Sequence, residues 1–243
     1  MITRFVFILL AILTLGMQVN YFQTYATAYF KIKYEKSVPL EDIKKLGEAL
    51  EHQYADAVHR FGLSLNHRID VYVYNSTVKF RADSRSLIFQ DGAVKNGDIF
   101  LMSPKVLNRE EKLQGVVARV VTRAVLDEVP LSPPWLRECY SLYAGGDLAS
   151  FGLPARFKAM GFSDLSEEFS TVQREKDVRE IYAKLAVTAD FLVNRYGEEK
   201  VEALFTNFYA GMTLDEAIEN SLAEKIDVVE KAWKIMLMNP PKE

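Results

Sequence analysis

The sequence predicts an α+β fold, in which an N-terminal mixed sheet packs with one long helix and the C-terminal half is mostly helical. Residues 29–34 alternate apolar and basic side chains, with the period of two that a half-buried strand requires. Residues 69–74 are rich in β-branched and aromatic side chains, which favour strands. Beyond Gly145, apolar residues recur three or four positions apart, as amphipathic helices require. Strands followed by a block of helices are typical of the α+β class.

The elements before residue 107 follow from local patterns. Residues 39–61 carry apolar side chains spaced for one face of a helix. Residues 76–82 read as a short helix that begins at a serine cap. Asp91-Gly92 and Asn96-Gly97 are turn signals on either side of a brief segment, and residues 98–102 form a further strand.

The second half is predicted to be helical. Residues 108–126 form one helix and residues 133–143 another, with proline in its first turn. Residues 178–196 form a long helix that ends at Gly197. Shorter helices are predicted at residues 198–209, 213–221 and 226–237.

Residues 1–28 are predicted to be a signal peptide or a membrane anchor. A short basic start is followed by an uncharged segment that extends to Phe30, with its strongest apolar stretch at residues 5–15. That stretch is shorter than the roughly 20 residues of a spanning helix, whereas residues 5–22 together make a marginal anchor. Ala28 completes a small-x-small pattern that suits cleavage. The protein is therefore expected to be exported, as a periplasmic, secreted or membrane-anchored protein that faces outside the cytoplasm.

The remaining chain is expected to form one domain at residues 29–237, with a sheet half at 29–107, a helical half at 108–237 and a tail at 238–243. A length of 243 residues with 49% hydrophobic content supports one sizeable core and excludes a disordered protein. The net charge of −3 provides no broad basic field, so nucleic acid is not expected as a partner. The single cysteine, Cys139, is expected to be a small buried residue.

Two helical segments carry the most informative pattern. Residues 117–123 read VARVVTR, and residues 134–139 read PWLREC. This pair resembles the active-site helices of gluzincin (HExxH, peptidase MA-like) zinc metallopeptidases, which read roughly V-A-H-E-x-T-H and W-L-x-E-G. The resemblance covers about residues 29–237 and implies a zincin-like fold.

In that family two histidines lie one turn apart on a helix face and bind one Zn²⁺, while the glutamate between them polarises water. The resemblance places Arg119 and Arg123 at the histidine positions, where a guanidinium has no lone pair to coordinate a cation. Val120 stands at the position of the general base and cannot accept a proton. Glu138 alone keeps its ligand type. The chain is therefore expected to be a degenerate member without zinc and without catalytic residues.

Arg119 and Arg123 admit two interpretations. The helix pattern puts both on its less apolar side, which is typical of a solvated face. If the two helices pack as the resemblance implies, both guanidinium groups instead approach Glu138 and form an ion cluster. Such a cluster need not stabilise the fold, but it would exclude zinc electrostatically. It would also leave a surplus positive charge for an anion or for an acidic side chain of a partner.

Tyr140 and Tyr143 follow Glu138, and they either line a cleft between the helices or pack as interface aromatics with one polar end. Asp127, at the end of the first motif helix, is expected to serve only a capping or dipole role. The residues predicted to bind a partner are Arg119, Arg123, Glu138, Tyr140 and Tyr143.

The favoured function is an exported pseudo-peptidase that binds an unidentified peptide or protein in the former active-site cleft. The family's substrates are extended peptides that pair with an edge strand, and the resemblance assigns that strand to residues 98–102. Two alternatives stay open. One is an active peptidase whose metal ligands are unrecognised or supplied by a partner. The other is a structural cell-envelope protein with a vestigial cleft, whose working surface lies on the C-terminal helices.

Overall fold

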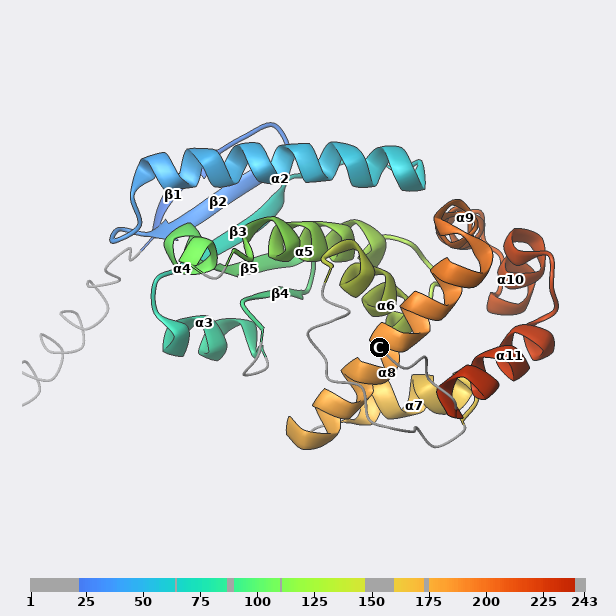
Figure 1. Cartoon of the computed structure of the whole chain (residues 1–243). Coiled ribbons are helices and arrows are strands. Elements are labelled where there is room, and N and C mark those ends of the chain that lie inside the picture. Colours follow the sequence, from blue (N-terminus) through green and yellow to red (C-terminus); the bar gives the residue numbers. More distant parts are fainter. Residues whose placement is uncertain are drawn as a thin grey trace, which may run out of the picture.

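The fold is α+β, as the sequence predicts, with a five-stranded sheet in the N-terminal part of the described chain and helices through the rest (Figure 1). The structure is a computed structural model, and it describes residues 22–63, 65–86, 90–109, 111–146, 160–172 and 175–238. The apolar stretch at residues 5–15 and nearly all of the candidate anchor lie outside the described residues. Among the described helices, none is long and apolar enough to cross a bilayer.

The sheet is mixed and has the strand order β1-β2-β3-β5-β4. Its strands are β1 (Phe22–Ala26), β2 (Phe30–Glu35), β3 (Ile69–Tyr74), β4 (Gly92–Lys95) and β5 (Asp98–Met102). β3 runs parallel to both of its neighbours, whereas β1 pairs antiparallel with β2 and β4 pairs antiparallel with β5. β1 and β4 are therefore the two edges of the sheet.

The core begins at one face of this sheet. Ile32 lies opposite Val71, which lies opposite Ile99 on the next strand, and all three side chains are fully buried. Alternation along each strand brings every second residue to the same face. The helices α2 (Leu40–Phe61) and α5 (Leu113–Asp127) pack against each other and against the sheet (Figure 1).

β1 lies within the segment that the sequence assigns to a leader or anchor. All five of its residues pair with β2, from Phe22 opposite Glu35 to Ala26 opposite Lys31. Just beyond it, the Thr27 hydroxyl donates a hydrogen bond to the carboxylate of Glu51 on α2. The sheet therefore begins before the predicted domain start at residue 29. The pattern of β1 is weak because most of its side chains are exposed.

The hairpin between β4 and β5 corrects a second expectation. Asn96 and Gly97 both have positive φ, 54° and 81°, as a type I′ turn requires. This turn folds β4 back along the outer side of β5, whose other side pairs with β3. The expectation that residues 98–102 form the edge strand is therefore wrong, and β4 occupies that edge.

The helix predicted at residues 108–126 is divided in two. α4 (Pro104–Arg109) ends before Glu111, whose φ of 56° lies outside the helical region, and α5 starts at Leu113. α5 then packs closely on α6 (Pro134–Ala144), since a Cβ added to Gly115 would lie only 2.5 Å from the carbonyl oxygen of Gly145. Glycine thus allows the close approach of the two motif helices.

The remaining helices are α3 (Thr77–Ser84), α7 (Phe162–Thr171), α8 (Glu175–Tyr196), α9 (Glu198–Tyr209), α10 (Leu214–Leu222) and α11 (Ile226–Met238). Ser76 caps α3 and Gly197 follows α8 with a φ of 89°, both as predicted. α8 packs on α6, which brings its inward face to the motif helices (Figure 1).

We predict that β1 contributes to stability. A chain that starts at Tyr29 should have a free energy of unfolding about 2 kcal/mol lower than a chain that starts at Phe22, because it loses two half-buried aromatic side chains and the Thr27 hydrogen bond. Urea unfolding followed by tryptophan fluorescence measures the difference. Equal midpoints and slopes for the two chains would show that β1 is dispensable.

Candidate functional site

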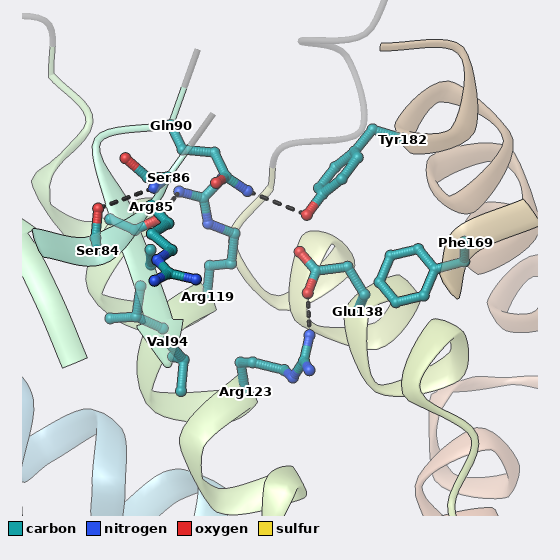
Figure 2. A pocket seen from close by; sticks show the side chains of 13 residues that line it. Ser84, Arg85, Ser86, Gln90, Val94, Arg119, Arg123, Glu138, Phe169 and Tyr182 are labelled. Carbon is teal, nitrogen blue, oxygen red and sulfur yellow. Dashed lines mark hydrogen bonds and ion pairs between the residues drawn. The ribbon is translucent and has the colours of Figure 1, made fainter. Parts of the chain in front are cut away.

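The candidate site is a cavity of about 240 Å³ that is enclosed by β4, α5, α6 and α8 (Figure 2). It contains three of the residues that the sequence predicts to bind a partner: Arg119, Arg123 and Glu138. The residues that line it are Ser84, Arg85, Ser86, Gln90, Gly92, Ala93, Val94, Arg119, Val120, Arg123, Glu138, Phe169 and Tyr182. Segments far apart in the sequence therefore meet around the two motif helices.

Arg119 connects α5 to the edge strand. Its side chain is 7% exposed, and Nη2 donates a hydrogen bond of 3.1 Å to the carbonyl oxygen of Gly92. β4 comes this close because Gly92 has no side chain, and a Cβ there would lie 2.7 Å from Val116. The expectation of a solvated helix face is wrong for this arginine.

Arg123 forms an ion pair with Glu138, which joins α5 to α6 (Figure 2). The two side chains are 20% and 10% exposed, so this pair is largely shielded from water. Arg123 also donates from Nε to the Asp127 carboxylate at 2.9 Å. Burial alone would lower the pKa of Arg123, but the carboxylates of Glu138 and Asp127 outweigh burial and raise it.

Asp127 extends this ion pair into a network. Its Oδ1 lies 3.1 Å from Nη1 of Arg137, and its carbonyl oxygen accepts a hydrogen bond of 3.2 Å from the same nitrogen. Asp127 therefore binds arginines of both motif helices, a role beyond the capping or dipole effect that the sequence suggests. Glu138, Arg123, Asp127 and Arg137 form a chain of alternating charge.

Tyr182 of α8 completes the wall next to Glu138. Its hydroxyl accepts a hydrogen bond of 3.1 Å from Nε2 of Gln90 (Figure 2). Burial, and then the charge of Glu138, raise the pKa of Tyr182, so its hydroxyl stays protonated next to that carboxylate. Sequence reasoning missed this residue, although a tyrosine on the buried face of the helix next to Ile181 was an available signal.

Tyr140 and Tyr143 lie outside the cavity. Tyr140 is 2% exposed, packs on Phe61 and Phe205, and donates to Glu202 at 2.8 Å. The Tyr143 ring lies 5.8 Å from the Tyr140 ring, centroid to centroid. Of the two interpretations, the interface aromatic with a polar end is therefore the one observed, because these positions of α6 face α2 and α9.

Val120 lines the cavity, whereas Cys139 packs between α6 and α8 outside it. Val120 is 1% exposed, and it packs beneath Gly92, where its side chain offers no proton acceptor. Cys139 is 1% exposed and its thiol donates to the carbonyl of Leu185. Burial raises the pKa of this thiol, which agrees with the expected structural role.

The donor set of the site does not suit a zinc ion. Zinc takes lone pairs from imidazole, thiolate or carboxylate groups, whereas Arg119 and Arg123 present only donors. Among the described residues of the cavity wall, Glu138 is the single carboxylate, and it pairs with Arg123. Within the described ranges, no group of three or more His, Cys, Asp or Glu residues is arranged to hold a metal ion.

The fold and the site together define a peptidase-like protein with a zincin-like architecture. A model of the Peptidase MA superfamily matches residues 110–239, which is more than half of the chain. The chain therefore belongs to the Peptidase MA superfamily. No curated protein sequence matches it.

A solved structure supports the fold. An M1 zinc metallopeptidase mutant from Deinococcus radiodurans, bound to a Tyr-Ser-Ala substrate, is similar with a TM-score of 0.52 and 12% identity over 91% of this chain and 53% of that one. The same peptidase mutant without that substrate has a TM-score of 0.47 at 12% identity, over 90% of this chain and 53% of that one. The chain thus spans about half the length of the peptidases it matches.

We predict strong energetic coupling between Arg123 and Glu138. Arg123→Met should lower the free energy of unfolding by about 3–5 kcal/mol, because it leaves a mostly buried carboxylate without its partner. Adding Glu138→Gln removes that charge, so the double variant should lose about 1–3 kcal/mol less than the sum of the single variants. Urea unfolding of the four proteins measures the coupling.

The exposed pair Arg195 and Glu224 provides the control for this cycle. Its side chains are 42% and 32% exposed, so the same substitutions there should couple by less than about 1 kcal/mol. Additive losses at Arg123 and Glu138 would mean that the two side chains do not interact in solution.

Proposed function

We propose that this protein is an exported, non-catalytic peptidase-like protein that binds an extended peptide or protein segment in the cleft bordered by β4, α5 and α6. The observation that carries the proposal is the Arg123–Glu138 ion pair in the wall of the cavity. By resemblance to the gluzincin motif, Arg123 and Glu138 stand where two zinc ligands would be. The ion pair therefore takes the place of the metal.

The chemistry of the neighbouring positions supports a loss of catalysis. By the same resemblance, Arg119 replaces the other zinc histidine and Val120 replaces the general base. A valine cannot take a proton from water, and a guanidinium repels a cation. Of the four groups that the zinc mechanism requires, the site residues thus retain only the carboxylate of Glu138.

The edge strand supports peptide binding. In an antiparallel pair, neighbouring residues alternate between pointing their backbone groups at the partner strand and away from it. Met102 N–H donates to the Asp91 carbonyl at 2.9 Å, and Gly92 lies opposite Leu101. Asp91 therefore points its carbonyl at β5, whereas Gly92 and Val94 point their N–H and C=O groups away from it.

The outward groups of β4 border the cavity, since both Gly92 and Val94 line it. The Gly92 carbonyl already accepts a hydrogen bond from Arg119. Val94 then offers both an N–H and a C=O to an added strand, in the manner of β-strand addition. A bound peptide is expected to pair with Val94 and to end or turn near Gly92.

Export through residues 1–28 is part of this proposal, and it rests on the basic start and the uncharged apolar run. Cleavage after Ala28 would remove β1, which pairs along its whole length with β2. This pairing favours a mature protein that keeps β1. The apolar segment would then anchor it in the membrane, with the folded domain on the outer side.

We predict that Val94→Pro weakens peptide binding about tenfold. Proline removes the outward N–H and one interstrand hydrogen bond, and it is tolerated on edge strands whose N–H does not serve the sheet. Fluorescence anisotropy against labelled random hexapeptides measures affinity, and mass spectrometry should recover the peptides uncut.

Thr24→Pro is the matched control, because Thr24 lies on the opposite edge strand. Thr27 N–H donates to the Phe30 carbonyl, and Thr24 pairs with Lys33, so the same alternation turns the Thr24 N–H away from β2. If peptides bind the wild type and both proline variants equally, β4 is excluded as the strand that pairs with the peptide. Failure of every peptide to bind wild type would favour a vestigial cleft, and cut peptides would favour an active peptidase.

A further inference from the structure

β1 ends the sheet on the side opposite to β4, and it has the features of an unprotected strand edge. Among the described strands it pairs with β2 alone. Such an edge is a template for another chain, so proteins usually blunt it with a charged side chain, a proline or a bulge. β1 reads FQTYA and pairs residue by residue with β2, so it has none of these devices. We propose that β1 pairs antiparallel with β1 of a second copy of this chain, which makes the protein a two-fold symmetric dimer.

The backbone groups of β1 are divided between β2 and the open side of the strand. The Thr27 N–H donates to the Phe30 carbonyl at 2.9 Å, so the backbone of Thr27 points at β2. Because successive residues of an antiparallel pair alternate in this direction, the backbone groups of Phe22, Thr24 and Ala26 point to the open side. Each of these three residues offers one N–H and one C=O to an added strand.

This set of outward groups is complementary to itself. In an antiparallel pair around a two-fold axis, Thr24 lies opposite the partner's Thr24, and Phe22 lies opposite the partner's Ala26. All three outward residues of each chain then exchange hydrogen bonds with the other chain. A register shifted by two residues leaves one of the three unpaired, so the pairing centred on Thr24 is the one that uses the whole strand.

The side chains of the same three residues suit this pairing. They lie on the sheet face away from the core residue Ile32, which is opposite Tyr25, and there Phe22 packs edge-on against Tyr72. Cross-strand neighbours on one face of a sheet interact directly. The dimer places Thr24 beside the partner's Thr24, which is a favourable pair, and the large Phe22 beside the partner's Ala26, which is small.

Electrostatics does not oppose this contact. No charged residue occurs between Phe5 and Phe30, so no like charges face each other across the two β1 strands. The lysines next to β1 are Lys31 and Lys33 of β2, and Lys33 is paired with Asp70 at 2.6 Å. The two β2 strands of the dimer are three strand spacings apart, about 14 Å, which exceeds the screening length at physiological salt.

β4, the other edge of the sheet, is less suited to a second copy. It carries Lys95, a charged residue of the kind that blunts strand edges. The outward carbonyl of Gly92 also accepts a hydrogen bond from Arg119 of the same chain. Pairing at β1 leaves the β4 edge accessible, because the residues that line the cavity do not include β1.

Cysteine cross-linking of the full-length protein in detergent tests the register of the two strands. The native Cys139 is buried, so an added cysteine is the reactive thiol. A short thiol-specific cross-linker should join Thr24→Cys chains, because the two Cα atoms lie about 5.5 Å apart. Ala26→Cys is the matched control, since its Cα atoms lie about 14 Å apart in this register, and its yield of covalent dimer should be about tenfold lower. Absence of cross-linking by Thr24→Cys, or equal yields at the two positions, would overturn the inference.

Proline at the same position provides a second measurement. Thr24→Pro removes the outward N–H at the centre of the pairing, and it should raise the dissociation constant of the dimer by more than about tenfold. Sedimentation equilibrium of the detergent-solubilised chain measures this constant, and circular dichroism checks the fold. Val94→Pro is the control, because it makes the same change on β4 and should leave the dimer intact. A wild type that stays monomeric, or a Thr24→Pro dimer as tight as the wild type, would contradict the pairing.

Discussion

The ion pair between Arg123 and Glu138 is the interaction on which the site depends. It bridges α5 and α6, which also approach each other closely at Gly115, and Asp127 and Arg137 extend it along the same interface. The transfer of both charges out of water opposes their attraction, so the pair need not add net stability. What it fixes is geometry, because two buried charges tolerate few other arrangements. In the proposed function, it also closes the position of a zinc ligand electrostatically to a cation.

The rest of the cavity follows from that arrangement. With Glu138 turned to Arg123 and Tyr182, the other arginine of α5 reaches across to Gly92 and joins the helix to the edge strand. This contact uses one outward carbonyl of β4, and in the proposed binding mode Val94 pairs with the incoming chain. The contacts of Arg119 and Arg123 thus connect α5 both to the edge strand and to α6.

The sequence predicted elements whose signals are local. The Asn96–Gly97 turn and the Ser76 cap were recognisable because a few adjacent residues determine them. Features that depend on distant partners were missed. β1 has a weak pattern and forms by pairing with β2, and the edge position of β4 depends on how three strands assemble. Tyr140 was expected beside Glu138 because it is near in sequence, whereas tertiary packing of α8 brings Tyr182 there instead.

The most direct test of the central claim is the metal content of the purified full-length protein. It is measured by elemental mass spectrometry after dialysis against a buffer that contains zinc. The account predicts far less than one zinc per chain and no peptide cleavage that chelators abolish. One tightly held zinc per chain that Glu138→Ala removes would contradict it, because that carboxylate would then be a metal ligand and not the partner of an arginine.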